Sequence, residues 1–285
     1  MTVVTFASLD AASYRDIVRR ALAEDVRWGD ATTEAVIPAK QKTSGTLVVE
    51  TSCVLAGLEV AAECFRQLDP QVTIELVRRE GEWCEEGAEV ARVAGFAAAL
   101  LTAERTALNF LRRLSALATL TRQLVDAGRG HVTVRDTRDT TPTLRVLERY
   151  AVRVGGGMNH RVGLDEGAVI SQNHLRLAGG VRDAVECMRL ADTETPIEVV
   201  VRTVDEIEAA IAAGAAVLRV DGAAGDLVRE AVRRSRGRAK VAVSGPLSAD
   251  RMAPAAEVGA EYVSLDVLTQ AAPRVAATLE LTRAG

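Results

Sequence analysis

The stretch PIEVVVRTVDEIEAAIAAGAAVLRVDG, residues 196–222, decides the fold class. It begins with a short run of β-branched residues, continues with a segment of helical period, and ends with a second apolar run. The two apolar runs are nearly unbroken, which is typical of strands that helices cover on both faces. A strand, a helix and a strand in succession predict two parallel strands joined by a crossover helix.

The same alternation extends through the second half of the chain. The runs typical of strands are HVTVRD, GAVIS, PIEVVV, AAVLRVDG, KVAVSG and EYVSLD, which begin at residues 131, 167, 196, 215, 240 and 261. The segments TVDEIEAAIAAG, DLVREAVRRS and SADRMAPAAEVG have helical period. We favour an α/β barrel over an open doubly wound sheet. No GxGxxG fingerprint or GxxxxGK[ST] loop occurs, which argues against Rossmann and P-loop folds.

The first part of the chain is expected to form a small α+β domain. The expected elements are a helix over 10–24, a turn-rich link over 24–33, a strand, turn and helix over 44–69, paired strands over 72–95 and a long helix that ends at Gly128. We expect an N-terminal domain over 1–110, joined by the C-terminal tail 275–285, and a barrel domain over 111–274.

Length and composition exclude several functional classes. At 285 residues, 48% of them hydrophobic, the chain can bury sizeable cores. The net charge of −4 and the nine aromatic residues (two Trp, three Tyr and four Phe) argue against nucleic-acid binding. No apolar segment is long enough to span a membrane, and the N-terminus lacks a signal-peptide pattern. Four scattered cysteines without metal-ligand spacing predict buried reduced thiols and a cytoplasmic location.

Polar residues stand at the ends of the expected strands, namely Asp136, Asp221, Ser244 and Asp266. The carboxyl ends of barrel strands form the active face, so side chains there are candidates for chemistry. A strand-end acid such as Asp221 can hold Mg²⁺ on a diphosphate, and the Ser244-Gly245 turn can donate amides to a phosphate. A helix cap or a salt bridge explains Asp221 equally well.

Cationic residues form further clusters. Arg138 follows a strand-end acid, and the hydroxyls and loop amides of Thr140 and Thr141 are candidates for binding an anion. His160 and Arg161 follow a glycine run that permits close backbone approach to a ligand. Together the clusters predict a polyanionic ligand, such as a dicarboxylate or a phosphate.

Two further candidates have simpler explanations. His174 follows an expected strand, although a lone histidine is more often structural. Arg105 lies on the expected long helix, where a surface ion pair with Glu104 explains it as well.

Several segments resemble the quinolinate phosphoribosyltransferase family, the decarboxylating nicotinate-nucleotide pyrophosphorylases. They are ALAEDVRWGDATTEAVIP, VLAGLEVAAECFRQLDP, LLTAERTALNFLRRLSALATLTR, DTRDTTPTLRVLERYAVRVGGGMNHRVGL and the Asn-His at 173–174. The resemblance implies an N-terminal open α/β sandwich and an incomplete, TIM-like barrel of the type II phosphoribosyltransferases. It also implies a homodimer with shared active sites, and leaves further assembly to a hexamer open.

The resemblance implies a reaction as well. The ring nitrogen of quinolinate displaces pyrophosphate from C1 of phosphoribosyl pyrophosphate, with Mg²⁺ assisting, and loss of the C2 carboxylate as CO₂ gives nicotinate mononucleotide. The implied catalytic residues are Arg105 (from the neighbouring subunit), Arg138, His160, Arg161 and Asp221, the last near Mg²⁺. The implied substrate-binding residues are Arg105, Thr137, Arg138, Asp139, His160, Arg161, Ser171, His174, Glu198, Arg202, Arg219, Asp221, Ser244 and Gly245.

Two departures from the family's pattern concern lysines. Asp139 stands where the family writes lysine in DTRKTTPG, and Ser171 where it writes lysine in KDNH. The chain keeps only three lysines among its 35 basic residues, but drift of that kind would give arginine here. Because an unpaired buried carboxylate is costly, we expect Asp139 to pair with Arg202 or Arg219, within about 4 Å.

Other departures concern the metal and the phosphate. Val200 replaces an acid that the family associates with the metal, although Glu198 remains. Arg202 stands where an acid is common, Arg219 replaces an apolar residue, and Pro246 removes an amide donor beside the phosphate turn.

Three functions are therefore open. The chain is a phosphoribosyltransferase for quinolinate or a related aromatic acid, or an enzyme with a changed acceptor, donor or reaction in a specialised pathway. The third alternative is a non-catalytic paralogue that binds a ligand.

Overall fold

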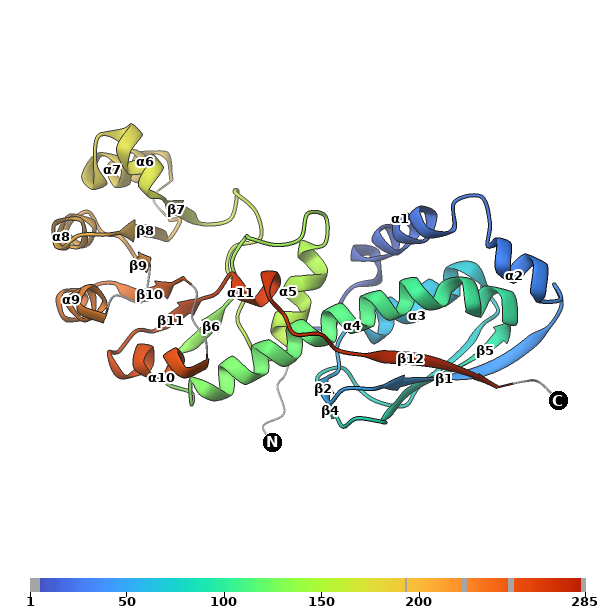
Figure 1. Cartoon of the computed structure of the whole chain (residues 1–285). Helices are drawn as coiled ribbons and strands as arrows, with labels where there is room; N and C mark the ends of the chain where they lie inside the picture. The colour runs from blue at the N-terminus through green and yellow to red at the C-terminus, as the bar shows by residue number, and fades with distance from the viewer. Residues whose placement is uncertain (1–5, 193, 222–224, 246–248, 283–285) are drawn as a thin grey trace. The chain divides into compact units, whose positions relative to one another are not determined.

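The computed structural model describes residues 6–192, 194–221, 225–245 and 249–282 (Figure 1). The chain divides into two compact units. The first contains the described residues of Met1–Arg122, Thr141–Gly156 and Ala271–Gly285, and the second those of Gln123–Thr140 and Gly157–Gln270. Of the helices in the described part of the chain, none combines the length and apolar character needed to cross a membrane.

The first unit is built on an antiparallel sheet of order β12-β1-β5-β3, with helices α3 and α4 over one face (Figure 1). Its elements are η1 (Ala11–Ser13), α1 (Arg15–Val26), α2 (Ala31–Val36), β1 (Lys42–Val49), β2 (Cys53–Val54), α3 (Leu58–Leu68), β3 (Thr73–Leu76), β4 (Trp83–Cys84), β5 (Glu89–Phe96), α4 (Ala97–Ala127, which continues into the second unit), α5 (Arg145–Val154) and β12 (Ala277–Thr282). The C-terminal strand β12 pairs with β1, from Ser44 opposite Thr282 to Val49 opposite Ala277.

The core of this unit holds three of the four thiols. Cys53, Cys64 and Cys84 are buried, and burial raises their pKa values to about 12, 12 and 11. Thiols with such pKa values stay protonated at neutral pH, so they behave as small apolar side chains. Cys187, in the second unit, is exposed and departs from the expected burial.

The link expected over residues 24–33 is shorter than predicted. Helix α1 continues to Val26, and α2 begins at Ala31. Asp30 starts the second helix, because its carboxylate accepts hydrogen bonds from the backbone N–H (3.0 Å) and the hydroxyl (2.6 Å) of Thr33. This side-chain cap satisfies a donor that the first turn of a helix leaves free.

The glycine run at the end of α5 serves helix packing. A Cβ atom on Gly155 would lie 2.5 Å from the carbonyl oxygen of Ala118 and 2.5 Å from Cβ of Thr121, both on α4. Arg122 of α4 also donates through Nε to the carbonyl of Gly155, at 3.0 Å. The close backbone approach predicted from the sequence therefore exists, but at Gly155 the partner is a helix and not a ligand.

The second unit is built on a six-stranded sheet of order β6-β11-β10-β9-β8-β7, and all five pairings between its described strands are parallel. Its strands are β6 (Thr133–Arg135), β7 (Ala168–Ile170), β8 (Ile197–Val201), β9 (Val217–Asp221), β10 (Lys240–Ser244) and β11 (Tyr262–Ser264). Its helices are α6 (Gln172–Ala178), α7 (Val181–Ala191), α8 (Val204–Ala212), α9 (Gly225–Ser235), α10 (Ala249–Glu257) and α11 (Val267–Gln270). All six predicted strands are present.

Strand order follows chain order from β7 to β11, and β6 pairs with β11. Helices α6 to α9 contact one another in sequence along the outer side of the strands (Figure 1). The mixed α/β class is thus confirmed, whereas closure of the sheet into a barrel stays a prediction. Since all strands run in one direction, their carboxyl ends meet at a single edge.

Candidate active site

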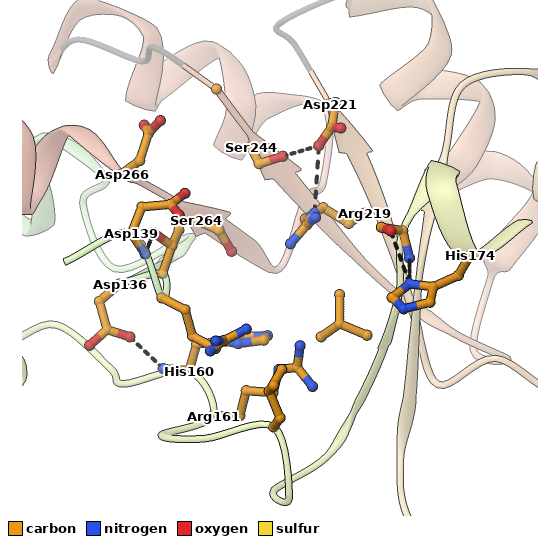
Figure 2. Close-up of a pocket in the computed structure, with 16 residues that line it drawn as sticks. Asp136, Asp139, His160, Arg161, His174, Arg219, Asp221, Ser244, Ser264 and Asp266 are labelled. Carbon is orange, nitrogen blue, oxygen red and sulfur yellow. Dashed lines mark hydrogen bonds and ion pairs between the residues drawn. The ribbon is translucent and has the colours of Figure 1, made fainter. Parts of the chain in front are cut away.

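A cavity of about 520 Å³ opens at the carboxyl ends of these strands (Figure 2). It is lined by Asp136, Thr137, Arg138, Asp139, His160, Arg161, Leu164, Val169, Ser171, His174, Arg219, Asp221, Ser244, Gly245, Ser264 and Asp266. Of the fourteen substrate-binding residues expected from the sequence, all but Arg105, Glu198 and Arg202 line it. The structure thus brings eleven of them together, and their roles remain predictions.

A short β-bridge brings the segment that leads to Arg138 and the segment that leads to His160 and Arg161 side by side. Met158 pairs with Arg135 at the edge of the sheet, and its N–H donates to the carbonyl of Val134 at 2.8 Å. Asp136, with 1% of its surface exposed, then accepts from the backbone N–H of His160 (2.6 Å) and from Nδ2 of Asn159 (2.6 Å). This buried acid therefore fixes the backbone that presents His160 to the cavity.

Beneath the cavity, Glu198 forms the centre of a buried ion cluster. Its carboxylate lies 3.1 Å from Nη2 of Arg135, 3.2 Å from Nε2 of His160 and 3.3 Å from Nη1 of Arg219. Burial raises the pKa of this carboxyl, but the hydrogen bond from His160 and the charges of Arg135, His160 and Arg219 outweigh burial and lower it to about 2. Glu198 is therefore ionised and holds Arg135, His160 and Arg219 in place.

Arg135 is a site component that the sequence analysis missed. It is buried, it lies over the ring of Tyr262 at 4.2 Å, and its Nη2 donates to Oγ of Ser264 at 3.0 Å. The available signal was a basic residue inside the β-branched run HVTVRD, because a charge in a covered strand needs a buried partner. Ser264 itself, which ends β11, was also missed.

Asp221 is held by hydrogen bonding and by arginines. It accepts from Oγ of Ser244 at 2.6 Å, and its oxygens lie 3.5 Å from Nε of Arg219 and 3.9 Å from Nη2 of Arg202. The salt-bridge explanation of this acid therefore applies. In the part of the chain that the structure describes, no three His, Cys, Asp or Glu residues form a group that could hold a metal ion.

The expected ion pair of Asp139 is absent, and that prediction is wrong. Asp139 is exposed, and no ion pair to it within 4 Å occurs among the described residues, whereas Arg202 and Arg219 pair with Asp221. The physical reason is exposure: a hydrated carboxylate does not need a neutralising partner, so the cost that motivated the prediction does not arise.

The loop after Arg138 does not offer its amides to a ligand as expected. The N–H of Asp139 donates to Oγ1 of Thr137 at 3.2 Å, and that of Thr140 to the carbonyl of Arg138 at 3.0 Å. In the first unit, the N–H and the hydroxyl of Thr141 both donate to the buried carboxylate of Glu148, at 2.8 and 2.7 Å. These donors are satisfied within the protein, so anion binding by this loop depends on its side chains.

Three arginines that line the cavity, Arg138, Arg161 and Arg219, form what we call the cationic wall. Figure 2 shows the guanidinium groups of Arg161 and Arg219 pointing into the cavity. Burial, followed by the charges of Arg138 and Arg219, lowers the pKa of Arg161. Mutual repulsion among guanidiniums is relieved when an anion binds between them. The wall is therefore suited to a carboxylate or a phosphate group.

His174 is fixed at the start of α6 by Ser171, the N-cap residue. The backbone N–H of Ser171 donates to Nδ1 of His174 at 3.1 Å, and the Ser171 hydroxyl lies 2.9 Å from the same atom. Because Nδ1 accepts, the neutral ring carries its proton on Nε2. His174 thus has Nε2 as a hydrogen-bond donor at the cavity.

One predicted position lies outside this site, and another is not among the described residues. Arg105 is exposed on α4 in the first unit, where its charge and that of Arg274 contribute, after burial, to lowering the pKa of Arg112. Pro246 lies outside the described residues.

Known proteins are similar to this chain over nearly its whole length. Residues 30–115 match the quinolinate phosphoribosyl transferase N-terminal domain, and 117–280 match its C-terminal domain. The nicotinate-nucleotide pyrophosphorylase [carboxylating] of Mycobacterium leprae is 39% identical over 91% of this chain and 93% of its own. The probable enzyme of that name from Bacillus subtilis is 35% identical over 91% and 90%. The solved nicotinate-nucleotide pyrophosphorylase of Francisella tularensis superposes with a TM-score of 0.91 at 32% identity, covering 96% of this chain and 98% of that one. The chain belongs to the quinolinate phosphoribosyltransferase family.

Proposed function

We propose that this protein transfers a phosphoribosyl group from phosphoribosyl pyrophosphate to quinolinate and releases CO₂ and nicotinate mononucleotide. The observation that carries the proposal is the cationic wall of Arg138, Arg161 and Arg219 at the strand ends of a family member. Curated relatives are named nicotinate-nucleotide pyrophosphorylase, which supports the same reaction. Quinolinate carries two adjacent carboxylates, and guanidinium groups match carboxylates in shape and charge.

The chain's residues supply binding and orientation for this chemistry. Arg138, Arg161 and His160 hold the ring carboxylates, so that the ring nitrogen faces C1 of the sugar. The nitrogen forms a bond to C1 as the C1–O bond breaks and pyrophosphate leaves with the electron pair. The C2 carboxylate then departs as CO₂, and the electron pair left on C2 is stabilised by the cationic ring nitrogen until C2 takes a proton. A cavity that excludes water strengthens each of these charge interactions.

Two properties of the assembly belong to the proposal. We place the protein in the cytoplasm as a homodimer in which Arg105 of one subunit reaches the cavity of the other. The exposure of Arg105 and Arg274, whose charges both act on the half-buried Arg112, supports the sharing of the site, because clustered arginines favour an anionic ligand. Mixing Arg105→Gln and Arg138→Gln subunits tests it. Recovery of activity that neither variant shows alone supports shared sites, and no recovery contradicts them.

The reaction is tested by mass analysis of products from purified protein, quinolinate and phosphoribosyl pyrophosphate, with and without Mg²⁺. We expect nicotinate mononucleotide in molar excess over enzyme. Arg161→Gln should lower kcat/KM by about a hundredfold, since it removes a charge-assisted bond to the substrate. Arg229→Gln is the matched control, because Arg229 pairs with Asp226 on exposed α9. A folded protein that yields no product under either condition overturns the proposal.

A further inference from the structure

Arg219 faces the cavity directly beside Val200. The two are register partners in the parallel pairing of β8 and β9. Glu198 lies two residues before Val200 on the same face, and Asp221 lies two residues after Arg219. The small apolar side chain of Val200 leaves this part of the face to the guanidinium of Arg219, which reaches Glu198 at 3.3 Å and Asp221 at 3.5 Å.

The acids on this face do not fit a divalent cation. Mg²⁺ is held by oxygen ligands, usually one or two carboxylates with substrate phosphates. Glu198 already has Nη2 of Arg135, Nε2 of His160 and Nη1 of Arg219 within 3.3 Å. Asp221 has Arg219 and Arg202 within 3.9 Å and accepts from Ser244. A metal ion at either carboxylate would lie beside a guanidinium, and like charges at such distances repel each other.

Two positions on this face differ in charge from the pattern that the family resemblance implies. Relative to that pattern, Val200 in place of an acid removes one negative charge, and Arg219 in place of an apolar residue adds one positive charge. The change is therefore +1 and +1, or +2 in total, on two directly paired positions. Arg202, whose side chain is 60% exposed, adds a further cation beside Asp221.

We propose that Arg219, held between Glu198 and Asp221, takes the place of a divalent cation and binds the diphosphate of the sugar donor directly. Guanidinium presents several N–H donors in a planar fork that matches phosphate oxygens. Glu198 and Asp221 fix this fork before the donor arrives, so little side-chain entropy is lost on binding. The identity of the donor rests on the proposed function, whereas the diphosphate site itself does not.

Calorimetric titration with inorganic pyrophosphate tests the site apart from catalysis. In excess EDTA we expect pyrophosphate to bind with a Kd within about threefold of the value in Mg²⁺, a difference under 1 kcal/mol. Arg219→Gln keeps a donor for Glu198 but loses the charge, and should weaken binding in EDTA by about a hundredfold. Arg229→Gln, on α9 of the same unit, should bind as the unaltered protein does. Binding that requires Mg²⁺, an undetectable pyrophosphate complex, or unchanged binding by a folded Arg219→Gln variant overturns the proposal.

A double variant, Val200→Glu with Arg219→Leu, reverses the charge change. It should lose pyrophosphate binding in EDTA and gain binding that depends on Mg²⁺, which loss of folding cannot produce. If the double variant stays folded and still binds pyrophosphate in EDTA, Arg219 is not the cation that binds the diphosphate. Product that forms only with Mg²⁺ contradicts this inference and leaves the proposed reaction intact. Metal-free pyrophosphate binding without any product contradicts the reaction and leaves the inference intact.

Discussion

Nε2 of His160 lies 3.2 Å from Oε2 of the buried Glu198 carboxylate. The pKa of Glu198, lowered to about 2, keeps this carboxylate ionised, so it can only accept hydrogen bonds. Nε2 of His160 must therefore carry a proton. The same oxygen also accepts from Nη2 of Arg135 at 3.1 Å, so one buried acid fixes one group from β6 and one from the loop between α5 and β7.

Loss of the Glu198 charge should destabilise the protein in a pH-dependent way. A pKa lowered from 4.5 to about 2 contributes about 3 kcal/mol to the free energy of unfolding. This contribution is present above the unfolded pKa and is lost as the pH falls through the folded one. Glu198→Gln should cost about that much at pH 7, and the cost should narrow below about pH 5. Urea unfolding of the unaltered protein and of Glu198→Gln, at pH 7 and below about pH 5, measures this cost. The control is Glu230→Gln on α9, and an equal cost for both variants would contradict the cluster's role.

Gly155 should tolerate no side chain. A Cβ atom there meets the backbone of Ala118 and the side chain of Thr121 at 2.5 Å, so Gly155→Ala must push α5 away from α4. We expect a loss of about 2 kcal/mol in unfolding free energy, as for other overpacked sites. Gly87→Ala is the control, because Gly87 has φ +83° but open space around it, and should cost about 1 kcal/mol. If Gly155→Ala costs no more than Gly87→Ala, contact with α4 does not explain Gly155, because its own φ of −70° suits any residue.

The strands of the second unit could be predicted well because each strand has a local signal in the sequence. Buried parallel strands are short apolar runs, and each of the six runs, such as 196–201, can be identified without knowing its neighbours. The link over 24–33 was mispredicted because a six-residue helix carries little periodicity, and its cap at Asp30 is a single residue.

The ion cluster could not be predicted in the same way. Arg135, Glu198 and Ser264 lie on β6, β8 and β11, and their contacts depend on strand order and on tilt. Strand period places Arg219 and Asp221 on one face, which the structure confirms. Strand period cannot predict where a side chain beyond the end of a strand points. Asp139 lies beyond the end of β6, and this is why the partner expected for it was wrong.

Glu80 should give the opposite pH dependence to Glu198. Its carboxylate accepts from the backbone N–H groups of Gly57 (2.9 Å) and Leu58 (2.6 Å) at the start of α3. Burial outweighs these bonds and raises its pKa to about 7. The group's stabilising contribution is complete below the unfolded pKa of 4.5 and is lost as the pH rises through 7.

Unfolding free energy measured between pH 5 and pH 8 tests this assignment. The unfolding free energy of the unaltered protein should fall by up to about 3 kcal/mol over this range because of Glu80. That of Glu80→Gln should fall by up to about 3 kcal/mol less. Glu198→Gln should leave this part of the pH profile unchanged. Parallel profiles for the unaltered protein and Glu80→Gln would show that Glu80 does not titrate in this range.

Asp139 should weaken binding of anionic donors. It lines the cavity, is exposed, and has no ion pair within 4 Å among the residues described. Asp139→Lys changes the charge at the cavity by two units and should tighten binding of pyrophosphate by about tenfold at low salt, with a smaller gain at high salt. Asp139→Asn should give part of this gain. Asp226→Lys makes the same charge change on an exposed helix and is the control. Equal effects of the two lysine variants would mean that net charge, and not the position of Asp139, sets the affinity.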